Sequence, residues 1–458
     1  MSYPLHCARW MIERSDDARE TLLRITGRRG VNASLLAGWL LSIGQTSAVK
    51  EVLAVLDSQE ALPMLWRASL SDDANERQQF IAAAEHCHAH NVRFPNSLDE
   101  VQMLQSLGDS AFARYLLGCF WYSKRRYDEA VSCWRETLEK SPDYAPAHRL
   151  LGVYSWNKQQ DATQALAYLQ RAVALKPENA RFLFELDFLQ KLLARPVHER
   201  LTTLVERKAV VLKRDDLTAE LLSLWNASGH YADAAAILDT RVFHPWEGGE
   251  GKITGQYLLN QLHRALQFIE RGAFKQATDC LKAALRYPDN LGEGRLPGQT
   301  DNDIWYLLGY CAEQAGDAQQ AAEYYQLARQ GGSTLDAGRY YNDQPADYLF
   351  WQGIALRKSG NPAQAEQHFR HFIDWAAQHR DDVPQVDFFA VSLPDLVVLD
   401  VSAQQRHQQH CLFIEALGHL GLGNVSASQQ AMQRLLQLNP AHDKAHLIRH
   451  ALQSGIFS

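Results

Sequence analysis

Residues 111–144, AFARYLLGCFWYSKRRYDEAVSCWRETLEKSPDY, contain the pattern that decides the fold. Small residues, Gly118 and Ala130, are combined with the large Trp134, and Pro142 stands near the end of the stretch. Small side chains at these positions let two helix axes approach closely, and the large side chain fills the space one turn away. Because proline cannot continue a helix, the second helix should end before it. The stretch therefore predicts a helical hairpin.

Copies of this pattern recur along the chain. They start near residues 111, 145, 180, 215, 258, 302, 346 and 409. The early steps are about 34–35 residues long, which is the period of the tetratricopeptide repeat (TPR), and the later steps are about 43 residues or longer. So many copies in register identify a TPR-type chain. We expect an all-α fold, namely an α-solenoid in which helical hairpins form a right-handed superhelix.

The longer steps place added residues between the second helix of one repeat and the first helix of the next. These inserts cover about 241–257, 290–301, 331–345 and 380–408. Equivalent positions of a solenoid line up along one edge, so the inserts should gather on a common rim. Upstream of residue 111 only helical periodicity remains. We therefore divide the chain into divergent helical hairpins (1–110), regular repeats (111–240) and repeats with inserted loops (241–458).

The overall composition narrows the class of function. Of the 458 residues, 46% are hydrophobic and 22% charged, and the net charge is −7. This balance is typical of a folded protein and argues against a nucleic-acid partner, which usually requires a basic surface. No apolar run is long enough for a membrane span. Seven cysteines without a CxxC spacing indicate a reduced, cytoplasmic protein.

Motifs for common chemistries are missing from the sequence. It contains no GxSxG, GxxxxGK[ST] or GxGxxG motif, so we expect neither a nucleophile elbow nor a nucleotide cradle. His86 and His90 would share a helix face, as metal ligands can, and His407, His410 and Cys411 form a similar group. Neither group has a second ligand cluster nearby in the sequence. We expect no metal and no cofactor.

Two inserts contain nearly the same segment, EGGEG at 247–251 and NLGEG at 290–294, each followed by a basic residue. Glycines beside Glu250 and Glu293 allow tight turns and close approach of a ligand. The two carboxylates could act as an acid–base pair or hold sugar hydroxyls. Alternatively, the loops brace adjacent repeats or dock another domain, and the glutamates cap helices. Bracing or docking is the favoured interpretation.

Further candidates come from the other inserts. Asp301-Asn302-Asp303 precedes a helix, where capping is the favoured interpretation and ligand binding the second. The 380–408 insert is long for a loop without structure of its own, which points to a functional segment. No residue is assigned a catalytic role. The candidate ligand- or partner-binding residues are His244, Trp246, Glu247, Glu250, Lys252, Glu293, Arg295, Asp301, Asp303, Asp387, Phe389 and Asp395.

The inserts also carry a narrower resemblance. The segment FHPWEGGEGK at 243–252, Tyr287-Pro288 with 290–295, the acidic triplet 301–303 and the segment FAVSLPD at 389–395 resemble the C-terminal TPR region of a family of large bacterial proteins. Those proteins carry, ahead of the repeats, a β-rich domain similar to galactose-mutarotase-like folds. The resemblance implies a carbohydrate-related context. The β-rich domain itself is missing from this sequence, so chemistry housed there is not expected here.

Two functions from different classes follow. The first is a scaffold that binds a protein partner, or a β-rich sugar-associated domain, on the concave face of the superhelix. The second is a contribution of Glu250 and Glu293 to a site that binds or processes carbohydrate. We favour the scaffold, and we expect the chain not to be an enzyme on its own.

Overall fold

The computed structural model describes residues 3–27, 29–90, 93–336, 344–384 and 398–457. Within these residues all regular secondary structure is helical, which confirms the predicted all-α fold. The helices form two compact units, residues 1–176 (unit 1) and 177–458 (unit 2). The three-part division by repeat character stays a prediction, because it sorts kinds of repeat rather than compact units. None of the described helices is long and apolar enough to cross a membrane.

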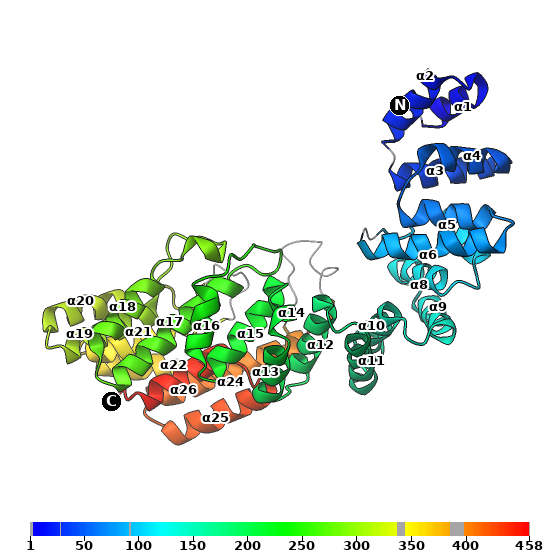
Figure 1. Ribbon diagram of the computed structural model, residues 1–458. Helices are drawn as coiled ribbons and strands as arrows, with labels where there is room; N and C mark the ends of the chain where they lie inside the picture. The colour runs from blue at the N-terminus through cyan, green and yellow to red at the C-terminus, as the bar shows by residue number, and fades with distance from the viewer. Residues whose placement is uncertain (1–2, 28, 91–92, 337–343, 385–397, 458) are drawn as a thin grey trace. The chain divides into compact units, whose positions relative to one another are not determined.

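Unit 1 is built from consecutive helical hairpins (Figure 1). Its helices are α1 (Tyr3–Glu13), α2 (Asp16–Thr26), α3 (Gly30–Ser42), α4 (Thr46–Leu56), α5 (Ala61–Leu70), α6 (Ala74–His90), α7 (Leu98–Ser106), α8 (Ala111–Ser123), α9 (Tyr127–Lys140), α10 (Ala145–Tyr154), the π-helix η1 (Ser155–Gln159) and α11 (Ala162–Leu175). The described residues upstream of 111 therefore form helices α1 to α7.

Unit 2 continues with longer connections. Its helices are α12 (Ala180–Leu192), α13 (Val197–Glu206), α14 (Lys208–Val211), α15 (Asp215–Ala227), α16 (Tyr231–Leu238), α17 (Lys252–Glu270), α18 (Phe274–Ala284), η2 (Asp289–Leu291), α19 (Asn302–Gln314), α20 (Ala318–Ala328), α21 (Tyr348–Lys358), α22 (Pro362–His379), α24 (Ala403–Gly421), α25 (Val425–Leu438) and α26 (Asp443–Gln453).

The hairpins pack as the small-and-large pattern predicts. In α8, a Cβ added to Gly118 would lie 2.4 Å from Nε1 of Trp134, which is fully buried on α9. In α19, a Cβ on Gly309 would lie 2.6 Å from the ring of Tyr325 on α20. Contacts this short leave no room for a side chain on the first helix. Each of these two hairpins is thus locked by a glycine on one helix and an aromatic residue on the other.

The structure corrects the predicted bounds of two inserts. Helix α17 begins at Lys252 and α24 at Ala403, so the first and fourth inserts are shorter than predicted. The reason is that the spacing of the repeats locates the packed middle of a helix and does not reveal a turn added at its start. The second copy of the pattern has one residue more between its glycine and its alanine, Gly152 and Ala165, than the first copy has between Gly118 and Ala130. The π-helix η1, which follows α10 directly, accommodates this extra residue.

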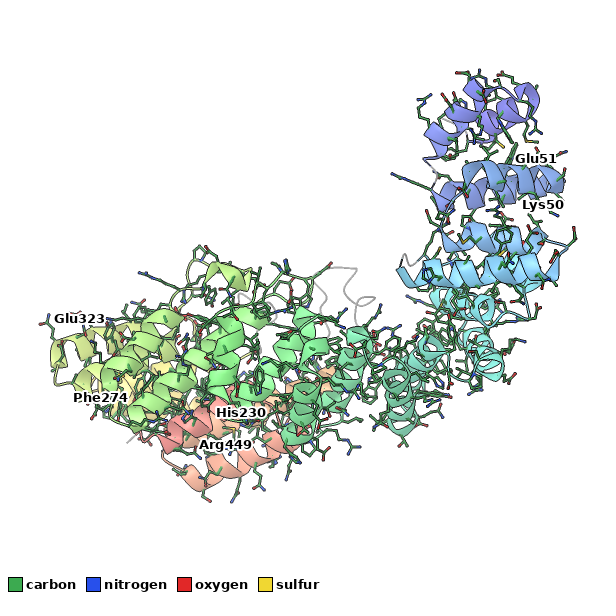
Figure 2. All side chains as sticks on the ribbon, in the orientation of Figure 1. Lys50, Glu51, His230, Phe274, Glu323 and Arg449 are labelled. Carbon is green, nitrogen blue, oxygen red and sulfur yellow. The ribbon has the colours of Figure 1, made fainter. Side chains whose placement is uncertain are left out.

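The last helix of unit 2 packs against helices about two hundred residues earlier in the chain. Helix α26 contacts α15 and α17. In Figure 2, His230 at the start of α16 and Arg449 of α26 are labelled near each other, and their neighbours in sequence are in contact, since the hydroxyl of Tyr231 lies 3.3 Å from Nδ1 of His450. Unit 2 therefore covers part of its own inner surface with its C-terminal helix.

Candidate ligand-binding pocket

The two glutamate–glycine inserts are in contact with each other. The backbone N–H of Phe243 donates to the carbonyl of Asn290 at 2.7 Å. The Asn290 amide in turn donates to the carbonyls of Leu238 and Arg241 at the end of the preceding hairpin. Gly292, with φ of +79°, lies so close that a Cβ would be 2.6 Å from the carbonyl oxygen of Phe243. The second insert thus caps the hairpin from which the first one starts.

Glu293 completes this brace. Its carboxylate accepts hydrogen bonds from the backbone N–H of Gly251, at 3.0 and 3.2 Å, and from the hydroxyl of Thr254 at 3.3 Å. These donors lie at the start of α17, where backbone N–H groups lack partners within the helix and a negative charge is stabilising. Glu293 is therefore a helix cap supplied by the next insert, as the bracing interpretation expects for one of the two glutamates.

The inserts gather around one pocket of about 810 Å³ in unit 2. Gly251 and Lys252 come from the first insert and the helix that follows it, residues 293–300 from the second, and Gln344 and Pro345 from the third. The remaining walls are helices α12, α15, α17 and α19, and the beginnings of α21 and α26. Three of the four inserts thus meet at one place, as predicted, and much of the fourth lies outside the described residues.

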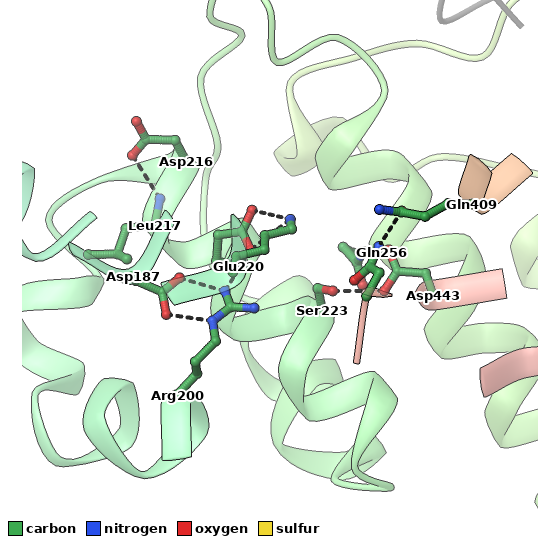
Figure 3. A network of polar contacts seen from close by, with 11 residues as sticks. Asp187, Arg200, Asp216, Leu217, Glu220, Ser223, Gln256, Gln409 and Asp443 are labelled. Atoms are coloured by element: carbon green, nitrogen blue, oxygen red, sulfur yellow. Dashed lines mark hydrogen bonds and ion pairs between the residues drawn. The ribbon is translucent and has the colours of Figure 1, made fainter. Parts of the chain in front are cut away.

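One wall of the pocket is a buried network of charges (Figure 3). Arg200, only 2% exposed, donates to both carboxylate oxygens of Asp187, at 2.7 and 3.0 Å, and to Glu220 at 3.0 Å. Lys191 also donates to Glu220, at 2.8 and 2.9 Å. Burial alone would raise the pKa of Glu220, but Lys191 and Arg200 outweigh it and lower the pKa to about 2. Glu220 therefore stays ionised and is fully occupied by its partners.

The opposite wall joins α26 to the starts of two other helices. The ammonium of Lys444 lies 3.3 Å from Asp347 and 3.6 Å from Asp303. Burial lowers the pKa of Lys444, yet the two carboxylates raise it by more, so the lysine stays charged. Asp443 accepts hydrogen bonds from Ser223 and Gln256, both at 2.7 Å (Figure 3). Every one of these charged groups already has an internal partner.

Lys252 differs from the other charged residues around the pocket. It is exposed, and no carboxylate among the described residues forms an ion pair with its ammonium group. Burial lowers the pKa of Lys252, although the negative charge of nearby Glu220 acts in the opposite direction. A lysine that is partly desolvated and unpaired gains from binding an anionic group. Lys252 is therefore the pocket's free cation among the residues that the structure describes.

Apart from Asp301, the predicted candidate residues fall into three groups. Lys252, Glu293, Arg295 and Asp303 line the pocket. His244, Trp246, Glu247 and Glu250 belong to the first insert but do not line the pocket: the His244 ring is exposed beside Asp215, the Trp246 ring packs over Gly249, and both glutamates are exposed. Asp387, Phe389 and Asp395 lie outside the described residues.

The acidic triplet behaves differently from the predicted helix cap. Asp301 stands at the N-cap position of α19 in a left-handed conformation, with φ of +44°, but its side chain makes no capping hydrogen bond. Its carboxylate instead forms an ion pair with Arg295. Asp303 accepts from the N–H of Ile304 at 2.9 Å, and burial raises its pKa despite the nearby Lys444. The triplet therefore joins the second insert and α26 to α19.

Sequence reasoning missed the part of the pocket that comes from the helices. The sequence analysis did not name Tyr348, Lys191, Glu220, Ser223, Gln256, Asp443 or Lys444 as candidates. The sequence did contain a signal for this part of the pocket. Helices α15 and α17 carry polar residues at positions that the structure buries, among them Asn226, Gln256, Asn260 and His263. Buried polar groups need partners. A search for groups of three or more His, Cys, Asp or Glu able to hold a metal finds none among the described residues.

The pocket belongs to a helical-repeat protein in which successive hairpins share one inner surface. A family profile described as "Tetratricopeptide repeat" matches residues 122–180, all but the last four of them in unit 1, and residues 262–338 in unit 2. The chain therefore contains tetratricopeptide repeats in these two segments, as its spacing predicted.

Several solved structures are similar at low sequence identity. The match to yeast Tom70 covers 99% of this chain and 94% of that one, with 12% identity and a TM-score of 0.32. The match to human IFIT1, in a dimer with PPP-AAAA, covers 93% and 95%, with 14% identity and a TM-score of 0.26. A chain of the Naa15/Naa10 complex bound to HypK-THB is matched over 77% of this chain, with 15% identity and a TM-score of 0.35. This chain spans only 50% of that protein's length.

These TM-scores are too low to carry an argument about function. None of the matches reported above concerns the bacterial sugar-associated proteins that the inserts resemble, so the carbohydrate-related context stays a prediction.

Proposed function

We propose that unit 2 is a scaffold that binds a segment of a partner protein in the pocket between the inserts, and that Lys252 receives an acidic group of that segment. The inner surface of a TPR superhelix is suited to holding peptides and helices. One observation carries the proposal: every described charge lining the pocket has an internal partner except Lys252. An acidic group on the ligand would supply the missing partner.

The pocket's size and lining support a peptide as the ligand. Its volume of about 810 Å³ is within the range of ligand sites. Tyr287 and Tyr348 provide aromatic surface, while Gln256 and Gln299 provide amide groups. Aromatic anchors combined with a few polar groups are typical of protein recognition. The same inner surface already holds a helix, α26, through polar contacts, which supports its ability to bind another protein segment.

Selection of peptides from a random phage-displayed library against the full chain tests this proposal. We expect the selected peptides to share an acidic residue. Lys252→Ala should weaken a selected peptide about tenfold or more, because a charge-assisted contact contributes about 1.5–3 kcal/mol. Lys275→Ala, at an exposed position of α18, makes the same change in charge outside the pocket and should leave affinity unchanged.

The carbohydrate hypothesis provides the alternative outcome. If no peptide is selected, but a glycan array yields a ligand whose binding is lost in Glu293→Gln or Glu250→Gln, the site is carbohydrate-related instead. Equal losses in Lys252→Ala and Lys275→Ala would also contradict the proposal, since affinity would then depend on overall charge and not on the pocket.

A further inference from the structure

The C-terminal helix α26 carries a row of histidines. His442, His446 and His450 are four residues apart, and this spacing places them on the same side of a helix. His442 immediately precedes the helix and caps it, since its Nδ1 accepts the N–H of Ala445 at 3.2 Å. His446 bonds through Nε2 to the carbonyl of Pro440 at 2.7 Å. Both of these hydrogen bonds are formed within α26 and the residues just before it.

The third histidine faces a fourth. Nδ1 of His450 lies 2.9 Å from Nδ1 of His263 on α17, and the two rings stack with Tyr231 of α16. A hydrogen bond between these two nitrogens requires one to carry a proton and the other to be bare. If both carried a proton, two N–H donors would point at each other. The docked pair therefore accommodates at most one proton at this contact.

The surrounding charges determine how many protons the row can accept. Around His450 and His263 the facing groups are Glu270 of α17, whose carboxylate lies 3.3 Å from Nε2 of His450, Tyr231 of α16, and His446. Around His442 and His446 they are Asp443 and Arg449 of α26 and Asp347 before α21. Glu270 favours one charge on His450. The second proton of the pair has no acidic partner among these groups.

We propose that α26 is a pH-sensitive cover over the inner surface of unit 2, held at neutral pH by neutral histidines and released as they take up protons. Release would enlarge the pocket, because Asp443 and Lys444 at the start of α26 form one of its walls. That consequence for binding rests on the proposed function, but the release of the helix does not.

The direction of the pH dependence follows from burial. Burial lowers the pKa of His442 to about 4 and, with help from His450 and His446, that of His263 to about 3. Burial also lowers the pKa of His446 and that of His450. At His450 the carboxylate of Glu270 opposes this shift. A released histidine titrates near ~6.5. The docked helix thus binds fewer protons, so its stabilisation is complete above about pH 6.5 and is lost as the pH falls below that value.

Hydrogen exchange of the full chain at pH 7.5 and 5.5, corrected for the intrinsic rate, tests the cover. Each histidine that must stay neutral raises the opening constant about tenfold over this range. We therefore expect exchange of α26 to rise tenfold or more relative to α20. An equal change in the two helices would overturn the proposal.

Substitutions then locate the effect. His442→Asn keeps a good capping residue that does not titrate, and should reduce the rise at low pH, as should the double variant His263→Asn/His450→Asn. His198→Asn, at an exposed position on α13, is the matched control and should keep the full rise. Circular dichroism at pH 7.5 verifies that each variant is folded. Folded variants that retain the full pH dependence would contradict the proposal, whatever the result of the peptide selection.

Discussion

Units 1 and 2 are built from the same kind of hairpin but differ in what they bury. Among the described residues, unit 1 buries one carboxylate, Glu100, whereas unit 2 buries a larger set of charged side chains: Glu185, Asp187, Arg200, Asp301, Asp303 and Asp347. The exposed large apolar side chains of unit 1 include Leu5 and Ile12 of α1, whereas those of unit 2 among the described residues are valines such as Val242 and Val383. Polar groups are buried only where they have partners. The comparison shows that packing of hairpins and construction of a site are separate properties of one repeat.

The largest expected effect concerns packing in unit 1. Trp134→Ala should destabilise this unit by about 3–5 kcal/mol, because it empties a fully buried position beside Gly118. Native-state hydrogen exchange in denaturant should show the loss in α8 and α9, while helices of unit 2 such as α19 keep their protection. Equal loss in α19 would break the comparison, since the two units would then unfold together.

The next prediction concerns the buried charges of unit 2. Arg200→Ala should destabilise that unit by about 3–5 kcal/mol, because it leaves Asp187 buried without its partner. Urea denaturation followed by circular dichroism measures the change. Arg171→Ala is the comparison in unit 1, since Arg171 and Asp143 are paired but exposed, and exposed pairs contribute little. A similar loss in both variants would show that burial of the pair is not the important difference.

A smaller effect is expected in the brace between inserts. Glu293→Ala should destabilise unit 2 by about 0.5–2 kcal/mol, the range for loss of a helix cap, because Gly251 and Thr254 lose their acceptor. Glu250→Ala, at an exposed position, should leave thermal stability unchanged. If both substitutions left the melting temperature unchanged, the hydrogen bonds of Glu293 would not stabilise the start of α17.

The smallest expected effect concerns the space around two glycines of unit 2. Gly255 lies within α17 and on the pocket wall, and a Cβ there would meet no atom within 4 Å. Gly255→Ala should therefore stabilise unit 2 by about 0.5–1 kcal/mol through helix propensity. Gly309→Ala, where the Cβ would press on Tyr325, should destabilise instead. Thermal denaturation of the two variants measures both changes in stability. A change of the same sign in both variants would be inconsistent with this packing.

The sequence allowed the hairpins to be predicted because their packing is local. Gly118 and Trp134 lie within one repeat, so residue size and spacing alone specify their contact. The same holds for the place of the inserts, which follows from counting residues between repeats. The first turn of α17 could not be predicted, because it depends on the left-handed conformation of Gly251 and on Glu293, which lies 42 residues further along.

The candidate site was predictable only in part. Lys252, Glu293, Arg295 and Asp303 stand in inserts that break the repeat, and that break is visible in the sequence. Lys191, Ser223 and Lys444 reach the same pocket from three helices far apart in the chain, and nothing in their local sequence relates them. Contacts such as that between Ser223 and Asp443 exist because the path of the superhelix brings α26 against α15.

By itself, the sequence determined the type of repeat, its helical hairpins and the positions of the loops, because each depends on side chains a few turns apart. Only the tertiary structure decided which loops meet, which charges are paired and that the C-terminal helix covers the inner surface. Those features depend on how small rotations between successive hairpins add up over about two hundred residues, and no local pattern of residues records that sum.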